Sequence, residues 1–117
     1  MSAEAIREFV ERFYAALDAG DAETASALFP DGTIIHLWDG RVFHTREEFR
    51  RWFVDLFSTS DNASRSVVDL HVDGNVAHVV VRLKASWRGK KRTVLLTHVF
   101  EFEGDHLVKV TVSIQPV

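Results

Sequence analysis

The 117-residue chain contains no cysteine, two prolines, one methionine and one tyrosine. The absence of cysteine excludes disulfides, thiolate metal ligands and thiol nucleophiles. No apolar run approaches the roughly 18 residues that a membrane span requires, and the first residues carry charge too early for a signal peptide. We therefore expect a soluble, cytoplasmic protein that contacts no membrane.

Neither sign of charge dominates the chain, which carries 14 basic and 17 acidic residues for a formal net charge of -3. Such a balance gives no overall basic field that would recruit nucleic acid. The only basic cluster, residues 88–92, has the composition of a hairpin tip, so a solvated turn and a phosphate site are the two interpretations. The histidines lack metal-ligand spacing and there is no glycine-rich phosphate loop, so we expect no metal and no bound cofactor.

The hydrophobic content of 46% is sufficient for one core, and we expect a single domain over residues 1–117. In the first half, apolar residues recur at helical spacing over residues 3–19, and a shorter helix is predicted over 22–29. Residues 33–38 have the composition of a strand. A third helix is predicted to begin at a capping box formed by Thr45 and Glu48.

The second half consists of four β-rich runs, at residues 64–73, 75–87, 92–103 and 106–115, separated by tight-turn signals. Their alternation gives one continuous apolar face, which needs the helices to cover it. The sequence therefore predicts an α+β fold in which three N-terminal helices pack on a curved, mainly antiparallel sheet and enclose a pocket.

One histidine interrupts an apolar alternation. Every second residue from Val94 to Phe102 is apolar except His98, so this imidazole should point into the core with its neighbours. Leaving a polar group buried and unpaired costs on the order of 1 to 3 kcal/mol. His98 therefore needs a partner, which either the chain or a ligand must supply.

Three further polar residues accompany this histidine. Tyr14 and Asp18 lie four apart on an otherwise apolar helix face, and Arg65 begins a strand. Each has an ordinary explanation as well, such as a tyrosine hydroxyl that reaches water or a surface arginine. Strict alternation turns Arg65 outward, and only a β-bulge around Val67 and Val68 would turn it inward. If it does, four polar groups converge on one apolar cavity.

The order of predicted elements, with Phe-Tyr-Ala-Ala-Leu-Asp-Ala-Gly-Asp at 13–21 and Ala-Leu-Phe-Pro-Asp-Gly-Thr at 27–33, resembles the NTF2-like superfamily over the whole chain. This superfamily includes ketosteroid isomerases, SnoaL-like polyketide cyclases and limonene epoxide hydrolases. The resemblance implies a cone-shaped cavity between sheet and helices. Where the isomerases have a carboxylate on the first strand this chain has Leu37, and their oxyanion tyrosine falls on Phe13.

A closer resemblance is to de novo designed luciferases built on an idealised NTF2-like scaffold. It rests on the chain length and on the combination Tyr14, Asp18, Ser60, Arg65, Leu96, His98 and Val110. The resemblance implies an enzyme that oxidises the synthetic imidazopyrazinone diphenylterazine with O₂ as co-substrate, without metal or cofactor, and releases CO₂ and light. It also implies two side-chain pairs, Tyr14 with His98 and Asp18 with Arg65.

For such a reaction we expect Arg65 to stabilise the substrate anion and Asp18 to offset and orient the guanidinium. His98, oriented by Tyr14, would hydrogen-bond the heterocycle or help accept its proton. The residues expected to contact the small-molecule luciferin are Phe13, Leu37, Ser60, Leu96 and Val110. We expect a monomer or weak homodimer. Two alternatives are an isomerase or cyclase that uses His98 as base, and a non-catalytic module that binds a small molecule.

Overall fold

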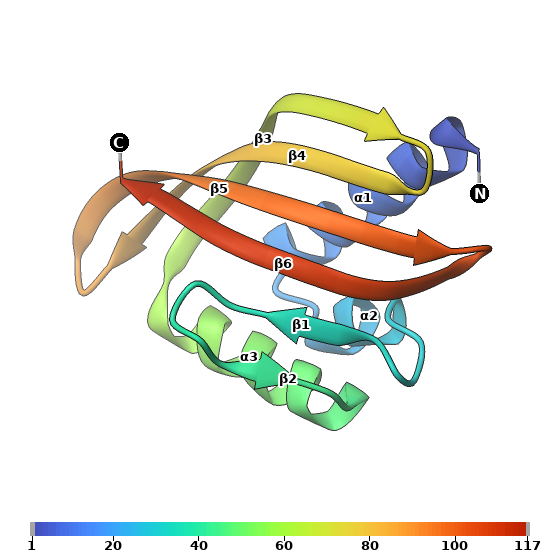
Figure 1. Ribbon diagram of the computed structural model, residues 1–117. Helices are drawn as coiled ribbons and strands as arrows, with labels where there is room; N and C mark the ends of the chain where they lie inside the picture. Colours follow the sequence, from blue (N-terminus) through green and yellow to red (C-terminus); the bar gives the residue numbers. More distant parts are fainter. Residues whose placement is uncertain (1, 117) are drawn as a thin grey trace.

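The computed structural model describes residues 2–116 and is an α+β fold of three helices and one curved sheet, as predicted (Figure 1). The helices are α1 (Ala3–Asp18), α2 (Ala22–Ala27) and α3 (Arg46–Thr59), and the strands are β1 (Ile34–His36), β2 (Val42–Phe43), β3 (Asp61–Asp73), β4 (Val76–Trp87), β5 (Lys90–Glu103) and β6 (His106–Pro116). The sheet order is β2-β1-β6-β5-β4-β3. Within residues 2–116, no helix is long and apolar enough to cross a membrane.

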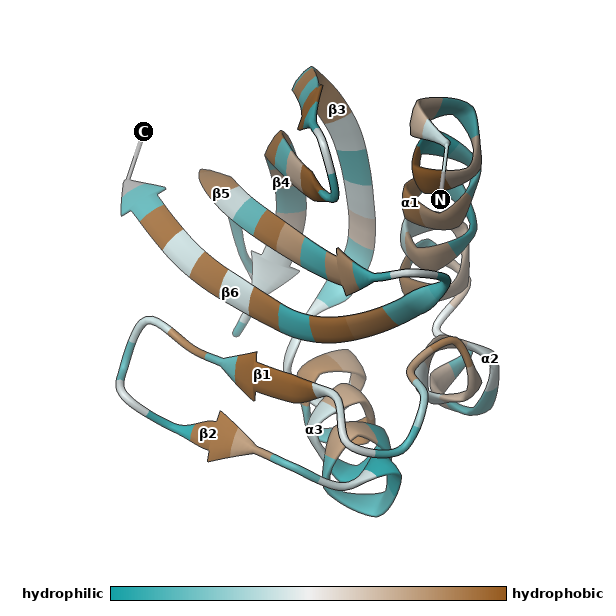
Figure 2. Cartoon of the chain, turned by 45° about the vertical axis from the view of Figure 1, so that its right-hand side comes forward, coloured by the Kyte–Doolittle hydropathy of each residue, from teal (hydrophilic) through white to brown (hydrophobic). Residues whose placement is uncertain are grey.

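Helix α1 forms where the helical spacing predicts it, and it ends at Asp18. The Ser2 hydroxyl accepts a hydrogen bond from the backbone N–H of Ala5, which satisfies one of the free donors of the first turn. Gly20, at φ +68°, carries the chain out of the helix in a conformation that glycine adopts without strain. Figure 2 shows the apolar face of α1 turned toward the sheet, where it forms one wall of the interior.

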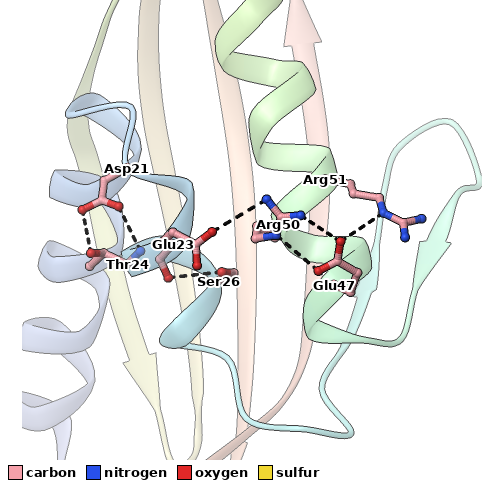
Figure 3. A network of polar contacts seen from close by, with 7 residues as sticks. All are labelled: Asp21, Glu23, Thr24, Ser26, Glu47, Arg50 and Arg51. Atoms are coloured by element: carbon pink, nitrogen blue, oxygen red, sulfur yellow. Dashed lines mark hydrogen bonds and ion pairs between the residues drawn. The ribbon is translucent and has the colours of Figure 1, made fainter.

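Side-chain caps begin α2 and α3, and a surface ion pair links the two helices. The predicted capping box is present, since Thr45 and Glu48 satisfy each other's backbone N–H groups at the start of α3. On the surface, Arg50 of α3 reaches Glu23 of α2 at 3.7 Å and Glu47 at 2.9 Å (Figure 3). Helix α2 ends at Ala27, earlier than the 22–29 predicted.

The four long strands form the predicted antiparallel meander. Along β5 and β6, apolar and polar residues alternate (Figure 2). Two features at the other edge were not predicted. Strand β1 runs parallel to β6, and the two-residue strand β2 pairs with β1. A strand of two residues is too short to show an alternation, which explains why the sequence pattern missed it.

A bulge interrupts β3 at the position that the orientation of Arg65 requires. Val67 lies opposite Val81 and Asp69 opposite Val80, so Val68 is an extra residue on β3. On the N-terminal side of this bulge, Arg65 lies opposite Leu83, which is buried on the inner face of β4. The bulge therefore turns Arg65 toward the interior.

Phenylalanine side chains fill the space between the helices and the inner face of the sheet. Phe13 of α1 contacts Phe29, Phe53 and Phe100, with ring centroids 5.1 to 6.0 Å apart. Tilted and edge-on pairs of this kind contribute about 0.5–1.5 kcal/mol each beyond their buried area. This cluster packs against His98, whose ring lies 5.8 Å from that of Phe100.

Candidate functional site

A cavity of about 370 Å³ lies between α1, α3 and the inner face of the sheet. Its wall is almost entirely apolar and aromatic, with Phe13, Trp52, Phe53, Leu96, Val110 and Ile114 among the lining residues. The charged or imidazole side chains in the lining are Arg65, Arg92 and His98. Among the described residues, no carboxylate lines the cavity, and no group of three or more histidine, aspartate or glutamate side chains could hold a metal ion.

His98 and Tyr14 form a buried pair behind this wall. The Oη atom of Tyr14 lies 2.7 Å from Nδ1 of His98, and the two rings are tilted against each other at a centroid distance of 5.5 Å. Both residues are almost fully buried. His98 lines the cavity whereas Tyr14 does not, so a ligand in the cavity would meet His98, and Tyr14 would contact that ligand only through His98.

Burial keeps both partners of this pair neutral. Loss of solvation, together with the smaller effect of the nearby positive charge of Arg65, lowers the pKa of His98 to about 3. Burial also raises the pKa of the Tyr14 phenol well above its ordinary value, an effect that Arg65 partly opposes. A neutral phenol therefore faces a neutral imidazole across the whole physiological pH range.

The neutral pair also determines which imidazole nitrogen carries the proton. Nδ1 is the one hydrogen-bond partner of the Tyr14 hydroxyl within residues 2–116, so the buried phenol proton is satisfied only if Nδ1 accepts it. The imidazole proton then sits on Nε2. His98 consequently presents an N–H donor to a ligand, and accepting a substrate proton, one of the two roles expected for it, does not fit this geometry.

Asp18 and Arg65 form the second pair. The Oδ1 atom of Asp18 lies 2.8 Å from Nη1 of Arg65, and its Oδ2 accepts a hydrogen bond of 3.2 Å from the backbone N–H of the same residue. The Arg65 side chain is only 4% exposed, whereas that of Asp18 is 33% exposed. The carboxylate thus fixes the guanidinium from outside the cavity, and Asp18 itself does not line it.

One donor of Arg65 remains without a protein partner. Its Nε atom is buried and makes no hydrogen bond to any residue in the described part of the chain. A buried donor of a charged group that lacks a partner is costly, and native structures rarely leave one. Arg65 also lines the cavity, so its guanidinium is the permanently charged group that a ligand bound beside it would meet.

The structure brings together only some of the residues that the sequence suggested. Phe13, Leu96 and Val110 line the cavity. Leu37 and Ser60 are absent from the lining residues within the described chain, and their contacts with a ligand stay a prediction.

The backbone and side-chain contacts of both residues are local. Leu37 keeps the alternation of β1 and is buried like Ile35, and its N–H donates to the carbonyl of Arg41 while its own carbonyl accepts from Gly40. The Ser60 hydroxyl donates to the carbonyl of Leu56 at the end of α3, 3.0 Å away.

The sequence analysis did not predict that Arg92 lines the cavity, because it grouped this residue with the basic cluster of residues 88–92 although a predicted strand begins there. The turn between β4 and β5 comprises only Arg88 and Gly89, both at positive φ, and β5 already begins at Lys90. Arg92 is therefore inside the strand, with the same parity as Val94 and His98, and it lines the cavity. This alternation along the strand was the feature of the sequence that could have predicted the inward position of Arg92.

The fold and site can be compared with known proteins. A model of the SnoaL-like domain matches residues 10–110, which is most of the chain. This chain belongs to the SnoaL-like domain family. A search of the curated proteins finds no match to this chain.

Solved structures share the fold at low sequence identity. A hypothetical protein from Catenulispora acidiphila with a ketosteroid isomerase-like fold, in complex with trimethylamine, is 14% identical with a TM-score of 0.83, over 91% of this chain and 84% of that one. A putative SnoaL-like polyketide cyclase from Jannaschia is 13% identical with a TM-score of 0.80, over 93% and 84%. An LEH-like epoxide hydrolase from M. tuberculosis is 16% identical with a TM-score of 0.79, over 97% and 84%. At such identities the likeness establishes the fold alone.

Proposed function

We propose that this SnoaL-like domain is a luciferase that binds an imidazopyrazinone such as diphenylterazine in the cavity and oxidises it with O₂, releasing CO₂ and light. The proposal starts from the resemblance of the sequence to designed luciferases. It is supported by a cavity of suitable size, since ligand pockets commonly measure about 300–1,000 Å³, and by an apolar wall around a few polar groups.

The observation that carries the proposal is the environment of the Arg65 guanidinium. Its side chain is 4% exposed, its Nε has no partner within the described residues, and the cavity beside it contains no carboxylate from that part of the chain. A guanidinium remains charged at any accessible pH, so this wall carries a permanent positive charge in apolar surroundings. Such a site favours a ligand that becomes an anion.

An imidazopyrazinone meets this requirement because it must lose its ring proton before O₂ can take an electron from it. Arg65 stabilises the resulting anion and so makes the proton easier to release to solvent at the cavity mouth. The anion and O₂ then combine, one oxygen atom leaves with the substrate carbonyl as CO₂, and the other remains on the product as an amide carbonyl. The electrons come from the substrate, and the protein supplies binding and electrostatics.

His98 and the apolar walls complete this function. The Nε2–H group of a neutral His98 can donate to an oxygen or ring nitrogen of the substrate, and the hydrogen bond of Tyr14 to Nδ1 holds the ring in that orientation. The aromatic and aliphatic lining excludes water, which strengthens the interaction with Arg65 and protects the excited product from quenching.

The experiment mixes the purified protein with diphenylterazine in air and records light, CO₂ and the oxidised product. We expect light above the buffer background and one CO₂ per substrate consumed. Binding of diphenylterazine without conversion would contradict the proposal and leave a small-molecule-binding module. No light together with turnover of a ketosteroid or polyketide substrate would contradict it in favour of an isomerase or cyclase.

A further inference from the structure

Arg92 occupies the end of the cavity that is formed by the β4–β5 hairpin. It lies opposite Ala85 in the sheet register, two residues from the turn-flanking pair Trp87 and Lys90. It lines the cavity together with Trp87 and with Trp38, which is 49% exposed. Because Arg92 is exposed while the cavity wall behind it is buried, these three residues form the cavity mouth.

The three cationic or donor groups are spaced along the cavity. His98 lies six residues from Arg92 on the same strand, which corresponds to about 20 Å at roughly 3.3 Å per residue. Arg65 lies opposite Leu83, which in turn lies opposite Val94, so its row in the sheet lies between those of His98 and Arg92. A ligand that reaches His98 and Arg65 with one end can extend its other end to the mouth.

Arg92 differs from Arg65 in having no acidic partner. Asp18 pairs with Arg65, whereas Arg92 forms no ion pair with any residue between 2 and 116. The acidic residue nearest in the register is Asp61, opposite Ser86 on the edge strand.

Other basic residues add to the positive electrostatic potential around Arg92. The adjoining turn and its flank add Arg88 and Lys90, although the chain as a whole carries a net charge of -3. A cluster of one sign at the mouth of an apolar cavity concentrates the field there and attracts ions of the opposite sign.

We propose that the mouth is an anion-binding subsite in which Arg92 binds a carboxylate, sulfate or sulfonate group on the outer end of an aromatic ligand, while the apolar body of that ligand fills the cavity. The site then prefers aromatic acids to neutral aromatics of the same shape. This proposal rests on the proposed function only in placing a ligand in the same cavity, and it requires no turnover.

Two fluorescent probes with the same aromatic body test this preference. The probe 1-anilinonaphthalene-8-sulfonate carries a sulfonate, and N-phenyl-1-naphthylamine does not. Fluorescence titrations compare the unmodified protein with Arg92→Gln and with Lys91→Gln, which removes one charge from the exposed Lys91 beside it in the same hairpin. Leu96→Trp fills the cavity and reports whether the probes bind inside it.

We expect Arg92→Gln to weaken sulfonate-probe binding by about tenfold, the low end for a hydrogen bond to a charged group. The neutral probe should change by less than about twofold, Lys91→Gln should leave both probes within about twofold, and Leu96→Trp should weaken both. Equal weakening of both probes by Arg92→Gln, an equal effect of Lys91→Gln, no effect of Arg92→Gln, or binding insensitive to Leu96→Trp would each overturn the subsite. An Arg92-dependent preference in a protein that emits no light with diphenylterazine would support the subsite and contradict only the proposed luciferase activity.

Discussion

The hydroxyl of Tyr14 lies 2.7 Å from Nδ1 of His98 and links helix α1 to strand β5 inside the core. The link joins residues 84 positions apart, so it connects the helical layer directly to the middle of the sheet. It also leaves Nε2 of His98 as the donor that faces the cavity. Both consequences can be measured.

Replacing Tyr14 with phenylalanine retains the ring and removes only the hydroxyl. Nδ1 of His98 then lacks its buried partner, and we expect the free energy of unfolding to fall by about 1–3 kcal/mol. Denaturant titration measures this change, and ¹⁵N chemical shifts of the imidazole report whether the proton sits on Nε2 in the unmodified protein. A double-mutant cycle with His98→Gln provides the control. Unchanged stability, or a proton on Nδ1, would contradict the assigned pair.

The depressed pKa of His98 makes stability depend on pH in a defined direction. The pKa is about 3 in the folded state and about 6.5 in an unfolded chain, so between these values the unfolded state binds more protons. Stability should therefore rise with pH from about 3 to about 6.5, by roughly 1 kcal/mol per unit, and the contribution of His98 should be constant above that range.

The measurement is the free energy of unfolding at several pH values for the unmodified protein and for His98→Gln. The variant should show a shallower slope on the acid side. His78→Gln is the matched control, because His78 is exposed on the same sheet and should leave the slope unchanged. A slope that is equal in all three proteins would contradict a buried neutral His98.

Leu96 and Val110 project into the cavity from neighbouring strands, and enlarging either one should crowd the ligand. We expect Leu96→Phe and Val110→Phe to weaken diphenylterazine binding by about tenfold, while the existing cavity limits the cost to folding. Leu95→Phe is the matched control, because the outer face of β5 carries Leu95. If both inner variants bound the substrate as tightly as the control, these residues would not form the ligand-contacting wall.

Asp18→Ala should reduce stability and activity together. The change leaves Arg65 buried without its acidic partner, which costs about 1–3 kcal/mol, less than a fully buried pair because Asp18 is one-third exposed. The guanidinium also loses the contact that orients it. Asp69→Ala removes an exposed carboxylate from β3, the strand that carries Arg65, and is the control. A variant with full stability and full light emission would show that Asp18 has no positioning role.

The sequence predicted His98 directly because its environment is a long strand with one buried face. The alternation from Val94 to Phe102 is a local pattern, and the structure buries His98 with the same neighbours. The inward orientation of Arg65 could be predicted only on the condition that a bulge is present. A bulge reverses which face of the sheet the residues beyond it point to, and the position of the bulge depends on how β3 pairs with β4. The extra residue Val68 supplies that reversal.

Other parts of the site depended on where strands begin and end. Leu37 has the parity of Ile35 and is buried with it, but within the described residues it is not in the cavity lining. Arg92 lies inside β5 because Arg88 adopts a positive φ that non-glycine residues seldom adopt, which shortens the turn to two residues. The parallel pairing of β1 with β6 joins segments far apart in the chain, and no local pattern specifies it.

The most direct test of the account compares light emission per folded molecule from Arg65→Ala and from Arg82→Ala. The first removes the buried cation from the cavity, and the second removes an exposed arginine from the outer face of β4. Circular dichroism establishes that each variant is folded. We predict that emission from diphenylterazine falls by about 10²–10³-fold for Arg65→Ala, as when a preorganised donor is removed, and stays near the unmodified level for Arg82→Ala. Full emission from a folded Arg65→Ala protein would contradict the central claim that this guanidinium stabilises the substrate anion.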